Sequence, residues 1–223
     1  MVMQGISLKI WQLYYKGEHL DKLFPICKPI YNPKPDKYLE NSMIVSLVDE
    51  IKAEGFEGYC GVLSWKFKEK INKEVNEQTF TCNSDVITFQ KDMGVKRHDP
   101  IQFANNYHGK GFEQVFKKIT PTDFLYPKKI KTIVYFNYFL CKEYVLIDYV
   151  DNVLAPAIDK LENDNSIQAI INQPQPYKKG RLPENLQTEW GINYYPMHVF
   201  LLERLFMYFL ENRNYSITSL WFT

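Results

Sequence analysis

Residues 59–64 read Tyr59-Cys60-Gly61-Val62-Leu63-Ser64, and residues 65–70 continue as Trp65-Lys66-Phe67-Lys68-Glu69-Lys70. The first half is a short apolar run that follows the Glu54-Gly55 break, which predicts a buried strand. The second half alternates lysines with aromatic rings. Ligands of an open α/β sheet bind beyond the carboxyl ends of its strands. A strand followed by a hydroxyl, an indole and ammonium groups therefore suits an anionic ligand such as a nucleotide diphosphate. The alternative is that the rings cap the core while the lysines face water.

The flanking sequence alternates between strand and helix patterns. We expect further strands at 6–15, 26–30, 85–89, 131–140 and 216–222, of which 131–140 has the strongest pattern. We expect helices at 38–53, 100–119, 142–162 and 196–210, with a kink at Pro156 and a stop at Gly55. The pattern predicts one α/β domain over residues 1–223, Rossmann-like, with a central, mostly parallel sheet flanked by helices. The strand-like end leaves open that it is the first domain of a longer protein.

Composition limits the classes of partner. The formal net charge is +1, which argues against a general nucleic-acid binder. No apolar run approaches the ~18 residues of a membrane span, and the N-terminus lacks the pattern of a signal peptide. The four cysteines form no CxxC pair, which is typical of free thiols in a reducing compartment. We therefore expect a cytoplasmic protein without a transmembrane segment.

Common catalytic motifs are missing from the sequence. It contains no GxGxxG, no phosphate-binding GKT or GKS, no HExxH and no GxSxG. The usual dinucleotide, ATPase, zinc-protease and serine-hydrolase assignments therefore lack support.

Four segments together resemble a family of capsular-polysaccharide glycosyltransferases. Tyr59-Cys-Gly-Val-Leu-Ser-Trp-Lys-Phe-Lys resembles that family's Y-x-G-L-x-H-Y-R-R-Y-F, and Ser84-Asp-Val-Ile-Thr-Phe resembles its Y-D-I-I-x-P. Tyr135-Phe-Asn-Tyr-Phe-Leu resembles its F-N-M-F-I strand. The closing segment Tyr195-Pro-Met-His-Val-Phe-Leu-Leu-Glu-Arg-Leu-Phe resembles its Y-Q-P-R-x-x-G-F-x-x-E-R-L-F helix. Order and approximate spacing agree across residues 6–210.

The resemblance implies a GT-A-like domain that transfers a sugar from a nucleotide-diphosphate donor to a glycan acceptor, in polysaccharide biosynthesis. The departures concern the donor site, because Ser64-Trp65-Lys66-Phe67 replaces His-Tyr-Arg-Arg and Met197 or His198 replaces the Arg before the last helix. The competing hypothesis is a non-catalytic α/β binding or structural module with the same aromatic cleft. A nucleotide-processing hydrolase is a third, weaker hypothesis.

The donor site is expected at the ends of the first and third strands. Such a site must stabilise the leaving diphosphate, and we assign Lys66 and Lys68 to that task in place of a metal. No cofactor is then required. If the lysines face water instead, a divalent Mn or Mg is needed, with Asp85 or Asp92 as ligand. The residues expected to bind the donor are Gln12, Tyr14, Tyr15, Ser64, Trp65, Lys66 and Lys68.

The acceptor side is expected to use Asp85, Asn137 and His198, with Glu203 as the catalytic base. Glu203 lies at the border of the apolar face of the last helix, and the Glu-Arg-Leu match carries the resemblance. Each has a structural alternative. Glu203 could pair with Arg204 or Arg213, Asp85 could cap a turn, and Asn137 and His198 could form buried hydrogen bonds. The sequence does not specify the sugar, the acceptor, the stereochemical outcome or the oligomeric state.

Overall fold

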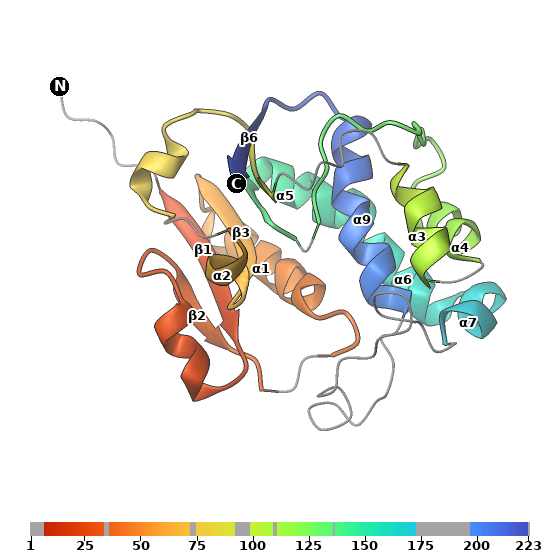
Figure 1. Ribbon diagram of the computed structural model, residues 1–223, viewed down its shortest axis with the longest axis horizontal. Coiled ribbons are helices and arrows are strands. Elements are labelled where there is room, and N and C mark those ends of the chain that lie inside the picture. The colour runs from red at the N-terminus through yellow and green to blue at the C-terminus, as the bar shows by residue number, and fades with distance from the viewer. Residues whose placement is uncertain are drawn as a thin grey trace.

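The structure is a computed structural model that describes residues 7–33, 36–71, 75–91, 99–108, 111–135, 137–172 and 197–222. Its centre is a six-stranded sheet in the order β2-β1-β3-β5-β4-β6 (Figure 1). The strands are β1 (Leu8–Tyr14), β2 (Lys28–Tyr31), β3 (Tyr59–Ser64), β4 (Val86–Lys91), β5 (Phe139–Lys142) and β6 (Ile217–Phe222). Strand β5 runs antiparallel to both of its neighbours, and the other neighbouring pairs are parallel. The α/β fold with a mostly parallel sheet is thus confirmed.

Strand β3 pairs along its whole length with β1 but along only part of its length with β5. Strand β1 pairs with all of β3, from Leu8↔Tyr59 to Leu13↔Ser64. Strand β5 pairs with β3 only through Tyr59↔Lys142 and Cys60↔Cys141. At the next position a side chain at Gly61 would place its Cβ 2.7 Å from Leu140 Cδ2 and 3.0 Å from the Phe139 oxygen, so the strands still touch there. Beyond Gly61 the β3–β5 pairing has ended.

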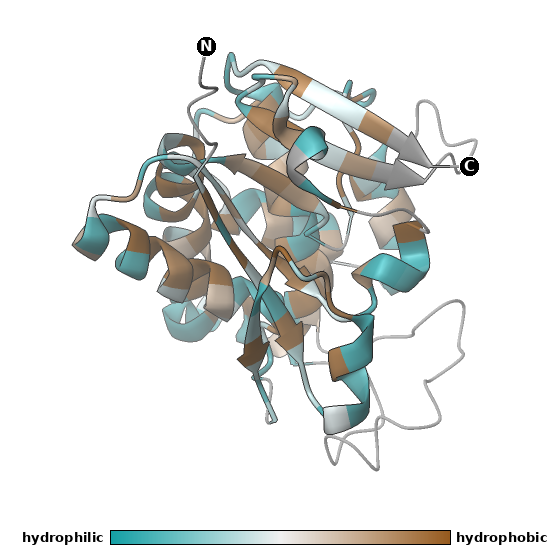
Figure 2. Ribbon diagram, turned by 90° about the vertical axis from the view of Figure 1, so that its left-hand side faces the viewer, coloured by the Kyte–Doolittle hydropathy of each residue, from teal (hydrophilic) through white to brown (hydrophobic). Residues whose placement is uncertain are grey.

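Helices cover both faces of the sheet unequally. One face packs against α1 (Glu40–Glu54), α3 (Pro100–His108), α4 (Phe112–Ile119), α5 (Glu143–Tyr149), α6 (Ala155–Asn163), α7 (Asn165–Ile171) and α9 (Met197–Glu211). In the part of the chain that the structure describes, the other face carries only the short elements η1 (Gly17–Lys22), α2 (Phe67–Ile71) and η2 (Glu77–Phe80). Strand residues alternate between the two cores, as the pleat requires: Trp11 and Leu13 face the first core, and Ile10 faces the second. In Figure 2 brown runs along the central strands, while several helices carry brown and teal stripes.

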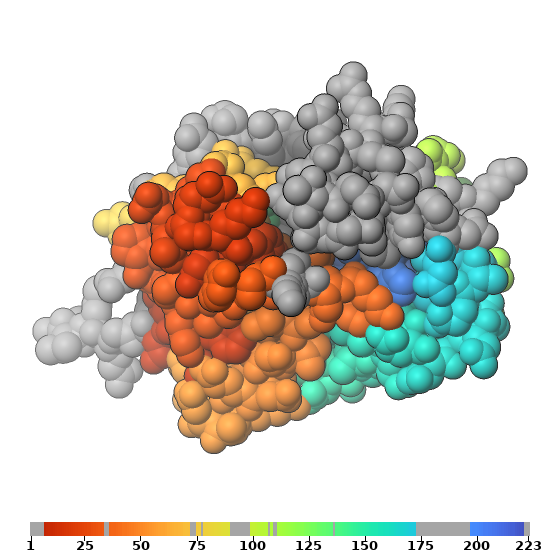
Figure 3. All heavy atoms as spheres, turned by 90° about the horizontal axis from the view of Figure 1, so that it is seen from below, coloured from red at the N-terminus to blue at the C-terminus, as the bar shows by residue number. Residues whose placement is uncertain are grey.

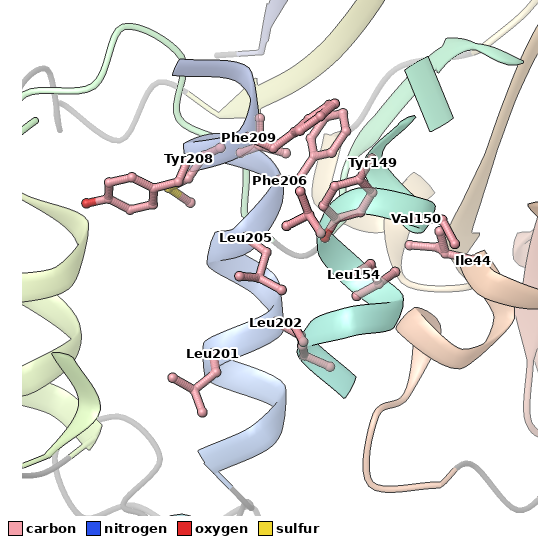
Figure 4. Close-up of a cluster of buried hydrophobic side chains, with 14 of the residues drawn as sticks. Ile44, Tyr149, Val150, Leu154, Leu201, Leu202, Leu205, Phe206, Tyr208 and Phe209 are labelled. Atoms are coloured by element: carbon pink, nitrogen blue, oxygen red, sulfur yellow. The ribbon is translucent and has the colours of Figure 1, made fainter. Parts of the chain in front are cut away.

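Helix α9 is the centre of the larger core. Almost all of its side chains are buried, as expected of a helix that is apolar all round. Figure 4 shows Phe206 and Phe209 directed toward Tyr149, and Tyr208 on the opposite side toward α3 and α4. The ring of Phe206 stacks on Phe139 of β5 at 3.5 Å between centroids. Because α9 is held on several sides, its few polar residues are fixed in position.

Most predicted boundaries agree with the structure to within a few residues. Gly55 ends α1 in the left-handed conformation (φ 60°, ψ 37°). The predicted 142–162 helix is α5 and α6 joined by a π-helical turn, η3 (Val150–Leu154). That turn lies directly before Pro156, which has no amide hydrogen to donate to the preceding turn.

The predicted strand at 131–140 is wrong over most of its length. Of the described residues of that segment, only Phe139 and Leu140 enter the sheet, in β5. The backbone amides of Lys131 and Thr132 bond to Glu211 at the end of α9 instead of to a strand. Asn137 then turns the chain with φ 56°. Tertiary contacts thus override the β-propensity of the segment.

The described helices include none whose length and apolarity would let it cross a lipid bilayer.

Candidate functional site

Several elements bring their ends to one edge of the sheet. Strands β1 and β3 are parallel and end there at Tyr14 and Ser64. Antiparallel β5 begins at the same edge, directly after Tyr138. The start of helix α1 lies near the first turn of α9. The ring of Tyr38, just before α1, contacts the His198 ring at 5.7 Å between centroids. Seen from below, atoms of α9 emerge between the α1 region and α7 (Figure 3).

Glu203 on α9 acts electrostatically on Tyr138 at this edge and on Tyr135. No hydrogen bond or ion pair joins it to any other residue in the described part of the chain, and its side chain remains partly exposed. Surrounding protein displaces its water and, with the nearby Glu40 carboxylate, raises the pKa of Glu203 to about 7, although Arg204 and Lys70 oppose the shift. A carboxyl group with a pKa near neutrality can accept a proton and release it again.

Arg204 does not pair with Glu203. Its Nη1 donates to the Phe200 oxygen at 2.6 Å and its Nε donates to the Pro100 oxygen at 3.3 Å. The buried guanidinium lies over the Phe112 and Tyr135 rings. The ion pair between Glu203 and Arg204 that the sequence left open is therefore not formed. Arg213 does not take its place, because it pairs with Asp148 at 3.4 Å.

Glu40 is the second carboxylate at this edge, and the sequence analysis missed it. It is the first residue of α1 and accepts a long hydrogen bond of 3.5 Å from the Tyr15 hydroxyl. Burial raises its pKa, while its backbone contact at the helix start, Lys70, Tyr15 and Lys66 oppose the shift. Only its position at the start of a helix that follows a strand of the same sheet could have indicated it.

Two lysines of the β3–α2 connection accompany the carboxylates. Lys66 and Lys70 both act electrostatically on Glu40, and the Lys70 amide bonds to the Lys66 oxygen at 3.1 Å, as expected one helical turn apart. Lys68 lies on another side of this turn, with its ammonium 5.5 Å from the centre of the Phe24 ring. The structure thus brings Lys66 to the predicted edge together with Lys70, which the sequence analysis did not select, and not Lys68.

Tyr138 joins the two sides of this edge. Its pKa responds to Ser64 at the end of β3 and to Glu203 on α9. Burial raises the pKa of Tyr138, nearby Ser64 opposes the shift, and the charges of Glu40, Glu203 and Glu69 raise it further. We refer below to the strand-end site, which consists of Tyr15, Glu40, Ser64, Lys66, Lys70, Tyr138 and Glu203.

The other predicted donor residues have structural partners. Gln12 is fully buried; its amide nitrogen donates to the Ser64 oxygen at 3.2 Å and its oxygen accepts from the Phe24 amide at 2.8 Å. Tyr14 packs on Tyr31 of β2 at 5.1 Å between ring centroids. Gln12 therefore supports the site from inside the sheet.

Trp65 is adjacent to the strand-end site but is already covered by neighbours. Its ring stacks on His19 at 3.8 Å between centroids and 14° between planes. The ammonium groups of Lys22 and Lys66 lie 4.6 and 5.0 Å from its ring centres. A nucleobase would have to displace one of these contacts in order to stack on Trp65.

The predicted acceptor residues do not gather in one place. Asp85 lies before β4, at the sheet edge opposite Ser64, where it bonds to Tyr144 and accepts from the Ser216 amide at 2.7 Å. Asn137 lies beside the site, and its Nδ2 donates to Asn41 Oδ1 at 3.5 Å, which links the turn to α1. His198 is buried with both ring nitrogens unpaired among the described residues, and desolvation lowers its pKa to about 4.

The strand-end site combines two carboxylates with two lysines. The described residues contain no group of three or more His, Cys, Asp or Glu side chains that could hold a metal ion. Asp85 is engaged elsewhere, and Asp92 lies outside the described residues.

Comparisons of the chain with protein-family models, curated proteins and solved structures find no significant match in any of the three. The resemblance to the capsular-polysaccharide glycosyltransferases therefore rests on the motifs quoted above.

Proposed function

We propose that the chain transfers a sugar from a nucleotide-diphosphate donor to a glycan hydroxyl at the strand-end site. One observation carries the proposal. Glu203, the residue that the Glu-Arg-Leu match selects as base, has a partly exposed carboxyl group without an ion-pair partner among the described residues, and its pKa is about 7. In support, the charge of Glu203 reaches Tyr138, which precedes β5 at the edge where β1 and β3 end and where α/β sheets of this kind bind ligands.

The reaction is a single displacement at the anomeric carbon of the donor. The acceptor oxygen forms a bond to that carbon as the bond to the diphosphate oxygen breaks, and its electron pair leaves with the nucleoside diphosphate. Glu203 accepts the acceptor's proton. Lys66 and Lys70 stabilise the negative charge that develops on the departing diphosphate.

The charge arrangement supports this division of tasks. Lys66 and Lys70 come from the β3–α2 connection, whereas Glu203 comes from α9 on the other side of the site. A donor that lay between them would have its diphosphate toward the ammonium groups and its sugar toward the carboxylates.

The first experiment is a thermal-shift panel of nucleotide-diphosphate sugars and free nucleoside diphosphates at millimolar concentration. At least one nucleotide sugar should raise the melting temperature, and the active donor should then release its nucleoside diphosphate when pooled glycan acceptors are added. Binding of a nucleotide sugar without turnover on any acceptor would favour the non-catalytic binding module. A melting temperature that none of the ligands raises would contradict the proposed donor site.

The second experiment tests the base. Glu203→Gln keeps the shape of the side chain but removes its basic oxygen, so we expect turnover to fall by ~100-fold or more with donor binding nearly unchanged. Asp49→Asn is the matched control, because it removes a carboxylate from an exposed position on α1. Unchanged turnover in Glu203→Gln would contradict the assignment.

A further inference from the structure

We propose that residues 125–131, the lysine loop, bind the chain to an anionic lipid surface through Leu125 and the lysines Lys128, Lys129 and Lys131. The loop lies between α4 and β5. It contains no residue of the strand-end site, so the inference is independent of the proposed function.

Both ends of the lysine loop are fixed to the C-terminal end of α9. The Leu125 amide donates to Asn212 Oδ1 at 2.7 Å, and Asn212 Nδ2 donates back to the Leu125 oxygen at 3.0 Å. At the other end of the loop, the amides of Lys131 and Thr132 donate to Glu211 Oε1. Because Glu211 and Asn212 are consecutive residues, the two ends of the loop lie close together, as in other compact surface loops.

Inward-facing side chains hold the same segment against the larger core. Phe124, just before the loop, is 5% exposed, and Ile130 within it is 7% exposed. Tyr126 is partly buried and packs against this core as well. Leu125 lies between two of these anchored residues and is nevertheless 73% exposed. The loop therefore presents an apolar side chain to the solvent from a backbone that is fixed on both sides.

The polar side chains of the loop carry positive charge. Lys128, Lys129 and Lys131 are exposed, and none of them forms an ion pair with another described residue. In the sequence from 120 to 132 the three lysines are accompanied by a single acidic residue, Asp123. The ammonium groups are therefore available to an anionic surface.

The combination of an apolar side chain with lysines favours a lipid surface over other anionic partners. A small anion or a peptide is bound in a concave site, whereas Leu125 is too exposed to be enclosed by one. A nucleic-acid backbone would be held by the lysines alone. At an anionic bilayer the lysines reach the headgroups while the leucine enters the boundary with the acyl chains. The apolar stems of the lysines add to this contact.

The first test is flotation of the full chain with vesicles of phosphatidylcholine, alone or with about a third of phosphatidylglycerol. We expect binding to the anionic vesicles only, and weaker binding as added salt screens the charges. Lys128→Gln combined with Lys129→Gln should lower the partition coefficient by about 25-fold, or about fivefold for each lysine. The matched control is Lys37→Gln combined with Lys52→Gln, which removes the same charge from two exposed lysines that are already ion-paired. It should change the partition coefficient by much less.

The second test uses Leu125, which distinguishes a bilayer from a soluble polyanion. Leu125→Cys in a Cys82→Ser background places an exposed thiol on the loop, since the other three cysteines are buried. An environment-sensitive fluorophore on that thiol should brighten with anionic vesicles and not with polyglutamate. Leu125→Ser should lower the partition coefficient by about 3- to 10-fold. Because these positions are exposed, we expect melting temperatures close to that of the wild type.

Three results would overturn the inference. The first is failure of the chain to bind anionic vesicles at low ionic strength. The second is an equal loss of binding in the loop variant and in the control variant. The third is a fluorophore that brightens equally with polyglutamate, which would identify the loop as a surface for an acidic macromolecule instead of a bilayer.

Discussion

At the scale of single residues, the site depends on carboxyl groups whose surroundings disfavour ionisation. Glu203 was predicted from its place on the apolar border of the last helix and from the Glu-Arg-Leu match. Glu40, the second carboxylate of the site, was not predicted, because a single glutamate at a helix start resembles an ordinary N-terminal residue. What brings the start of α1 to the site is tertiary structure, including the contact of Tyr38, just before α1, with His198 of α9, and no local pattern contains that contact.

We expect ionised Glu203 to lower the free energy of unfolding at neutral and higher pH. Its pKa is about 7 in the folded chain and 4.5 in the reference state. The folded chain therefore binds this proton more tightly, and the free energy of unfolding falls as pH rises from 4.5 through 7. Glu203→Gln removes this effect, so at pH about 8 it should be more stable than wild type by roughly 1–3 kcal/mol, and by much less at pH about 5.

Chemical denaturation of both forms at the two pH values measures this difference. Asp49→Asn serves as the control, because its carboxylate is exposed. A Glu203→Gln variant that unfolds more easily at both pH values would instead mark Glu203 as a residue that holds the scaffold together.

At the scale of elements, the β3–α2 connection determines which lysines reach the site. The sequence located this connection correctly, because the apolar run of β3 ends at Ser64. It did not reveal that α2 begins at Phe67. Helical geometry instead places Lys66 and Lys70 on one side and Lys68 on another. The failed prediction at 131–140 has a similar cause, since contacts with Glu211 and the turn at Asn137 outweigh a local β pattern.

The lysines of this connection can be separated by substitution. Lys66→Ala combined with Lys70→Ala should weaken binding of a nucleoside diphosphate by about 10- to 100-fold, the loss of two charge-assisted contacts. Lys68→Ala is the matched control from the same turn and should change the affinity little, because its ammonium lies over Phe24. Binding measured by calorimetry should also persist in chelator, and strict dependence on Mn or Mg would contradict the lysine assignment.

At the scale of the whole molecule, the sheet consists of two parts joined by β5. Strands β2, β1 and β3 form a parallel unit with α1, and β4 and β6 form a parallel pair on the far side of β5. The sequence predicted the α/β class and the strands other than β5 from alternation and turn residues. It could not predict that β5 would be short and antiparallel, because strand direction depends on how distant segments pair. The strand-end site spans the two parts, with Ser64, Lys66 and Glu40 on one and Tyr138 and Glu203 on the other.

The short β3–β5 ladder limits how the two parts of the sheet are connected. Among the described residues, strand pairing joins β3 to β5 at Tyr59 and Cys60, the edge farthest from the site. The shared core of α1, η3 and α9 joins the two parts on one face. A movement of the parts toward each other around a ligand would therefore break no hydrogen bond between β3 and β5, although it would have to shift side chains in that core. Spin labels at Ser46 on α1 and Gln102 on α3, both exposed, in a Cys82→Ser background should move closer together when a nucleotide sugar binds. An unchanged distance distribution would mean that the two parts are rigid and that the site is fully formed before its ligand arrives.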